Sequence, residues 1–140
     1  MPPSTRSSQP LRKPTVVGLA GLAAALAAGC GAVGRVTSGD AVAGKKLFQK
    51  TCGSCHTLAD AGTTGTIGPN LDDAFAADKA QGFSLTTMRD LVRGQIAYAE
   101  SDTGTGHPGM TPNLLHGQQA RDVAWYVAQC AAEPHCNVPS

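Results

Sequence analysis

The pattern C-x-x-C-H, formed by Cys52, Cys55 and His56, is the feature of this sequence that most limits the folds open to it. Two thiols three positions apart on a helical turn can reach the two vinyl groups of a single haem and bind it through thioether links. The imidazole that follows then lies beneath the iron as an axial ligand. The pattern therefore predicts a covalently bound haem at Cys52, Cys55 and His56.

The C-x-x-C spacing also occurs in dithiol redox proteins and in zinc sites. A thioredoxin-like protein needs strands beside its motif, whereas the flanking segments here have helical or glycine-rich patterns. A structural zinc ion needs four ligands, and the remaining pair Cys130 and Cys136 does not form a second C-x-x-C. Haem attachment therefore explains the pattern better than a dithiol redox site or a zinc site. A third alternative is that the protein is an exported lipoprotein in which the C-x-x-C-H sequence occurs by chance.

The composition suits a fold that is completed by a cofactor. The chain has 140 residues, which is room for one domain, and only three Phe, two Tyr and one Trp. A large, flat, apolar cofactor can take the place of the missing core side chains. A nucleic-acid partner is excluded, because the only adjacent basic residues of the main part of the chain are Lys45 and Lys46, a pair typical of a solvated helix face.

The first 29 residues have the pattern of a signal peptide. Residues 1–14 are polar and carry three positive charges, and residues 16–28 form an uncharged apolar stretch. The segment that ends in Cys30 resembles the lipobox of bacterial lipoproteins, although Ala27 stands where such boxes usually have Leu. We expect cleavage after residue 29 and lipidation of Cys30; an uncleaved membrane anchor is the alternative.

Residues 30–39 are mostly small and are expected to form a flexible, lipidated tether. The folded domain is then expected to span residues 40–140. Such an arrangement predicts an exported protein, held by its N-terminus at the outer face of the cytoplasmic membrane or in the periplasm.

Over about residues 40–132 the sequence resembles the class I, monohaem cytochrome c family. Residues 40–51 are expected to form a helix capped by Asp40, with Gly44 and Phe48 at the family's usual contact positions. The last helix, about residues 117–131, places Val123 and Tyr126 where the family has the side chains that meet them. The resemblance implies that these two helices cross.

Two further helical segments are expected at about residues 72–79 and 84–95, the second capped by Ser84. The resemblance thus implies an all-α fold, with three to five helices around one covalent haem c.

The segment at residues 67–71 matches the family's G-P-N-L sequence. In the family the proline carbonyl accepts a hydrogen bond from the axial histidine, a role that falls here to Pro69 toward His56.

Met110 occupies the place of the family's methionine ligand, in a Gly/Pro-rich loop ahead of the last helix. The family commonly has Met-Pro, so Thr111 is a small departure. Met88 lies within an expected helix among apolar residues and is interpreted as a core side chain. His107 and His116 compete with Met110 for the sixth coordination position.

Cys130 and Cys136 are expected to form a disulfide, because paired cysteines of exported proteins are usually oxidised. Pro134 should end the helix and let the chain turn back between them. The family resemblance does not contribute to this expectation.

The resemblance implies a single-electron carrier rather than an enzyme, since an iron with two axial ligands has no vacant position for a substrate. The expected partners are redox proteins: a donor dehydrogenase or quinol-oxidising complex and an acceptor oxidase, in a respiratory or dehydrogenase-linked chain. The rival interpretation is a haem enzyme or gas sensor, which requires a labile sixth ligand.

Overall fold

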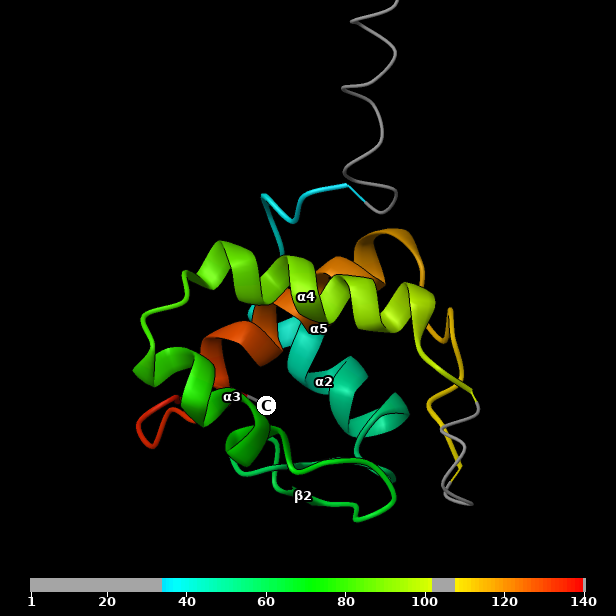
Figure 1. Ribbon diagram of the computed structural model, residues 1–140, viewed down its shortest axis with the longest axis horizontal. Coiled ribbons are helices and arrows are strands. Elements are labelled where there is room, and N and C mark those ends of the chain that lie inside the picture. The colour runs from blue at the N-terminus through cyan, green and yellow to red at the C-terminus, as the bar shows by residue number, and fades with distance from the viewer. Residues whose placement is uncertain (1–33, 102–107, 140) are drawn as a thin grey trace, which may run out of the picture. The chain divides into compact units, whose positions relative to one another are not determined.

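Four helices and one short hairpin form the part of the chain that the computed structural model describes, residues 34–101 and 108–139 (Figure 1). The helices are α2 (Ala41–Thr51), α3 (Leu71–Ala80), α4 (Leu85–Tyr98) and α5 (Gly117–Cys130). Strands β1 (Thr57–Leu58) and β2 (Thr63–Thr64) pair antiparallel. The expected all-α fold is confirmed. The expected signal peptide, Cys30 and His107 lie outside the described residues.

Polar side chains start three of the helices. The Asp40 carboxylate accepts hydrogen bonds from two backbone N–H groups at the start of α2, and Ser84 accepts one from Thr87 at the start of α4. Asn70 caps α3 in the same way. α4 runs three residues beyond the expected end at residue 95, because Ile96 and Ala97 continue its buried stripe. Within the described residues, none of the helices has the length and apolar character to cross a membrane.

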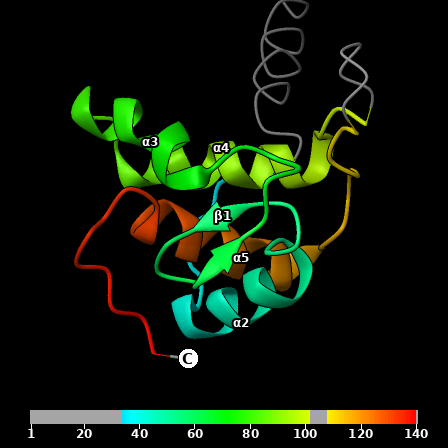
Figure 2. The ribbon, with the colours of Figure 1, turned by 90° about the horizontal axis from the view of Figure 1, so that it is seen from below.

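The first and last of these helices, α2 and α5, cross as expected (Figure 2). Gly44 faces the backbone of Asp122, where its lack of a side chain lets the helices approach closely. Next to this contact the rings of Phe48 and Tyr126 meet edge to face, with 6.0 Å between their centroids. Both rings are fully buried, so this contact is the centre of the helix crossing.

The segment before α2 is packed against the domain. Val36 is 1% exposed and lies in the hydrophobic core, and its backbone N–H donates to the Asp90 carboxylate on α4 at 2.7 Å. Gly39 lies against the side chain of Trp125. The expected domain boundary at residue 40 therefore leaves out a core residue. A lone Val in a stretch of small residues has no periodicity that could reveal its burial.

Lys45 is buried, at 7% exposed, and does not belong to the expected solvated face, whereas Lys46 is exposed. The Lys45 ammonium donates to the Val138 carbonyl oxygen at 2.6 Å and lies 3.3 Å from the Asp60 carboxylate. The Tyr126 hydroxyl donates to the same carboxylate at 2.7 Å. Burial of the charge is tolerated because it is paired and hydrogen-bonded.

The disulfide Cys130–Cys136 joins the end of α5 to the chain that follows it, with 5.1 Å between the two Cα atoms. The expected pairing is present in the structure. The disulfide and the Lys45 hydrogen bond together hold the C-terminal segment, residues 131–139, in which Val138 is buried.

Candidate functional site

Two adjoining cavities, of about 270 and 300 Å³, open beside the C-terminal end of α2. Four residues line both cavities: Cys52, His56, Pro69 and Met110. The first cavity is also lined by Cys55 and by residues from the segments 67–69 and 108–111. The second extends between helices and is lined mainly by apolar side chains of α3, α4 and α5, among them Phe75, Leu91, Val92, Ile96, Val123 and Val127.

A single turn that continues α2 holds the two thiols and the imidazole together. The backbone N–H groups of Cys55 and His56 both donate to the Cys52 carbonyl oxygen, at 3.0 and 2.9 Å. Burial raises the pKa of the Cys52 thiol from its usual 9.0 to about 11, and the charge of Cys55 adds to the rise. Both cysteines are free and half-buried. Their thiols stand for the sulfur atoms that thioether links would use.

The His56 ring is held from two sides. Its Nδ1 lies 2.9 Å from the Pro69 carbonyl oxygen; since a carbonyl only accepts, Nδ1 carries the proton and donates. The Nε2 lone pair is then available for a metal ion. The ring also lies against Gly68, where a Cβ would overlap its Cε1 atom. Sequence reasoning identified Pro69 but missed Gly68, whose position before Pro69 was the available signal.

The hairpin β1–β2 supports the backbone of this turn. The Thr63 hydroxyl donates to the His56 carbonyl oxygen at 3.0 Å and accepts from the Leu58 N–H at 3.1 Å. The Thr57 hydroxyl donates to the Gly65 carbonyl oxygen at 2.9 Å. These threonines were missed from the sequence, because no pattern in so short a hairpin shows which side chain hydrogen-bonds back to the backbone.

The candidates for the sixth ligand differ in whether they line the cavities beside His56. Met110 lines both cavities together with His56. Met88 is 1% exposed in the core and lines neither cavity. His116 is exposed at the start of α5 and also lines neither. Among the described residues, Met110 is therefore the candidate that shares a cavity with His56.

These groups fit a covalently attached haem. Two free thiols and one imidazole lie within one helical turn, and a thioether sulfur shares their cavities. The second cavity offers the apolar walls that a porphyrin requires.

Comparison with known protein families agrees with this reading of the site. The family model described as Cytochrome c matches residues 41–131. The match includes the four helices, the C-x-x-C-H pattern and the loop with Met110.

Proposed function

The chain belongs to the cytochrome c family, whose members carry covalent haem c and transfer electrons, and from this we propose its particular role and ligands. The protein is a single-electron carrier in a respiratory or dehydrogenase-linked chain. Cys52 and Cys55 would hold the haem through thioether links, and His56 and Met110 would ligate its iron. The observation that carries this assignment is that all four side chains line the same cavity.

Haem c supplies a one-electron couple between Fe(II) and Fe(III). His56 is held by its hydrogen bond to Pro69, which fixes the tautomer and the orientation of the ring. Met110 offers a soft, neutral sulfur that favours the reduced state and raises the reduction potential relative to a second histidine. With both positions filled by side chains of the protein, a substrate finds no coordination position.

The rim of the first cavity supports electron exchange with a protein partner. Ile67 and Leu114 line this cavity and are 57% and 44% exposed, which makes the rim around Cys55 apolar. Apolar residues at the centre of a contact are typical of protein interfaces. The proposed partners are a donor dehydrogenase or quinol-oxidising complex and an acceptor oxidase.

The proposed location is the outer face of the cytoplasmic membrane or the periplasm. Its support is the sequence before the described residues, where an apolar stretch at residues 16–28 leads to Cys30. The domain is tethered there through lipidated Cys30.

Two measurements test the ligand assignment. Haem staining of the denatured protein on a gel should be positive, because only a covalent haem survives denaturation. The ferric protein should show the weak far-red charge-transfer band of methionine-ligated iron, and Met110→Ala should abolish it. Met88→Leu is the matched control and should keep the band, since Met88 lines neither cavity.

Carbon monoxide separates the carrier from its rival. The reduced native protein should retain its low-spin spectrum in the presence of carbon monoxide, whereas Met110→Ala should bind the gas. Tight binding by the native protein, or a far-red band that survives in Met110→Ala, would overturn the proposal and favour a haem enzyme or gas sensor.

A further inference from the structure

The arginines of the described residues gather around one part of the domain. They are Arg35, Arg89, Arg93 and Arg121, whereas the lysines lie on α2 and α3. Arg35 forms an ion pair with Asp90 on α4 at 3.8 Å. The segment before α2 meets α5 at Gly39, where an added Cβ would lie 3.0 Å from the Arg121 carbonyl oxygen. We name these four residues, together with Trp125, the arginine face.

Trp125 joins the two helices of the arginine face. The Arg89 guanidinium carbon lies 3.4 Å from the centroid of the Trp125 ring, a cation–π contact between α4 and α5. Arg93 follows Arg89 by one helical turn, and Arg121 precedes Trp125 by one turn, so both lie beside this contact. A half-buried Trp among arginines is a combination that suits the boundary between water and lipid headgroups.

The positive charge of the arginine face is not fully balanced within the described residues. Asp90 is paired with Arg35, and Asp122 is 6% exposed and accepts hydrogen bonds from the Asp40 N–H and the Gln118 amide. The four arginines outnumber the neighbouring carboxylates of Asp40, Asp90 and Asp122, so the face keeps a net positive charge that a phosphate could neutralise.

The arginine face also lies where the chain enters the domain from its apolar N-terminal segment. Arg35 follows Cys30 by only five residues, a span of at most about 18 Å when fully extended. The Val36 N–H is hydrogen-bonded to Asp90 on α4, and the Val36 side chain is in the core. The chain before α2 therefore cannot come away from the domain, and so increase the distance to Cys30, without breaking these contacts.

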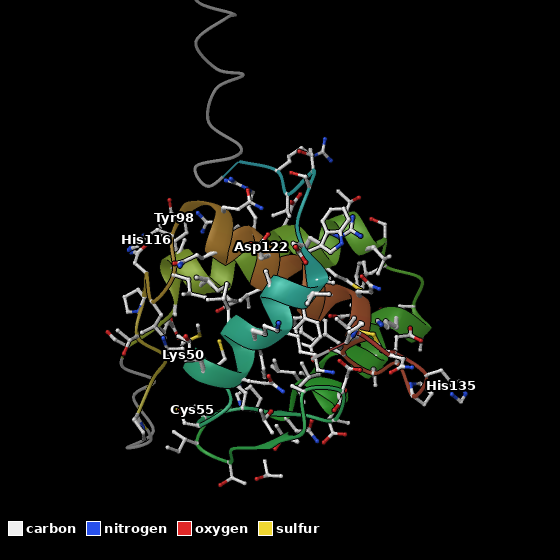
Figure 3. The ribbon with its side chains drawn as sticks, turned by 180° about the vertical axis from the view of Figure 1, so that it is seen from behind. Lys50, Cys55, Tyr98, His116, Asp122 and His135 are labelled. Atoms are coloured by element: carbon white, nitrogen blue, oxygen red, sulfur yellow. A yellow bond between two sulfur atoms is a disulfide. The ribbon has the colours of Figure 1, made fainter. Side chains whose placement is uncertain are left out.

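The thiols lie at the other end of the domain's first helix. Asp40 and Cys52 flank α2, an 11-residue helix and hence about 16 Å long. Figure 3 shows Asp122 near the start of α2, and Lys50 and Cys55 at its far end. Around α4, Arg89 and Arg93 lie about half a turn from Leu91 and Gln95. The buried residues Val92 and Ile96, which also line the second cavity, lie between them.

We infer that the arginine face lies on an anionic lipid surface and so orients the domain with the Cys52 end of α2 turned away from the membrane. The inference rests on the membrane tether proposed above. Phosphate headgroups would neutralise the arginines, while the apolar rim at Ile67 and Leu114 would stay open to redox partners.

The test uses the full-length, haem-loaded protein with phosphatidylcholine vesicles, with or without a fraction of phosphatidylglycerol. Flotation with the vesicles shows whether the protein is held on the membrane. The rate at which phenylglyoxal modifies each arginine, measured by mass spectrometry, shows whether the arginine face is covered by lipid. Modification of Arg89, Arg93 and Arg121 should slow by at least about threefold when phosphatidylglycerol is present. Salt at about 0.5 M should remove the difference, because it screens the attraction.

Variants identify the face. Arg89→Gln/Arg93→Gln should abolish the slowing at Arg121, and Arg121→Gln should weaken it at Arg89 and Arg93. Arg121→Gln is the milder change, because its side chain is bonded only to Gln118 among the described residues. The control Lys46→Gln/Lys50→Gln removes two charges from exposed positions of α2 and should leave the protection intact.

The outcomes separate this inference from the tether. Flotation on both kinds of vesicle with unchanged arginine modification would overturn the orientation and leave the tether standing. Equal protection on phosphatidylcholine alone, or loss of protection in the lysine variant, would also overturn it. Flotation on neither kind of vesicle would overturn both, and flotation with protection only on anionic vesicles would support the arginine face without the tether.

Discussion

Gly44 on α2 lies against the backbone of Asp122 on α5 so closely that a Cβ at position 44 would overlap the Asp122 carbonyl oxygen. The obstacle is backbone rather than a flexible side chain, so relief requires the two helices to move apart. Gly44→Ala should therefore lower the free energy of unfolding by about 2–3 kcal/mol, as measured by denaturant unfolding of the haem-loaded protein. The matched control is Gly94→Ala in α4.

Apart from its chain neighbours and the backbone of its own helix, no heavy atom of the described residues lies within 4 Å of the position that a Gly94 Cβ would take. Gly94→Ala should thus be neutral or stabilise the protein by about 0.5–1 kcal/mol, through helix propensity. Equal effects of the two substitutions would contradict a close crossing of α2 and α5.

Gly68 determines how the His56 ring lies. An added Cβ would overlap the ring, whose Nδ1 is meanwhile held by the Pro69 carbonyl. Gly68→Ala should rotate or displace the imidazole, at a cost of about 1–3 kcal/mol in unfolding free energy. The g values of the ferric protein in electron paramagnetic resonance should change with the ring orientation. Pro69→Ala keeps the carbonyl oxygen and serves as the control; unchanged g values in Gly68→Ala would show that the ring is held elsewhere.

The disulfide Cys130–Cys136 should stabilise the C-terminal segment. Closing so short a loop contributes about 2 kcal/mol in the chain-entropy model, and Cys130→Ser/Cys136→Ser should lose about that amount. Alkylation of the unfolded protein without reductant, followed by mass measurement, should label neither thiol. Labelling of both residues would show that the bond is absent.

Tyr126 should make the stability of the protein fall at alkaline pH. Its pKa is raised well above the usual 10.0, first because burial disfavours the phenolate, and then because of the hydrogen bond to Asp60 and the charges of Asp60 and Asp72. Above pH 10 the unfolded chain loses this proton while the folded protein keeps it. The contribution of Tyr126 is therefore complete below pH 10 and decreases above it, by up to about 1.4 kcal/mol per pH unit.

Tyr126→Phe should remove that part of the decline above about pH 10, at a cost of about 1–3 kcal/mol near neutral pH for the lost hydrogen bond. Tyr98→Phe is the control, because the Tyr98 side chain is 64% exposed. An unfolding free energy that depends on pH in the same way in Tyr126→Phe and in the native protein would refute the assignment.

Much of the fold was predictable from the sequence because the informative patterns are local. Asp40 and Ser84 mark helix starts since a cap acts within its own turn, and the C-x-x-C-H pattern places thiols and imidazole on one turn regardless of the surroundings. Gly44, Phe48 and Tyr126 were recognised as contacts through the family resemblance. The disulfide between Cys130 and Cys136 was expected because paired cysteines of exported proteins are usually oxidised and Pro134 lets the chain turn back between them.

Only the tertiary structure could decide the properties that depend on residues distant in sequence. Lys45 is buried because Asp60 and Val138 supply its partners, and no local pattern reveals a partner 93 positions away. Val36 belongs to the core for the same reason, and the arginine face exists only once α4, α5 and the segment before α2 are brought together. The sequence alone determined the chemistry carried by Cys52, Cys55 and His56, since it arises within one helical turn. Packing decided which side chains enclose and orient that turn. Burial and charge balance depend on residues from the whole folded chain, so no local pattern shows them.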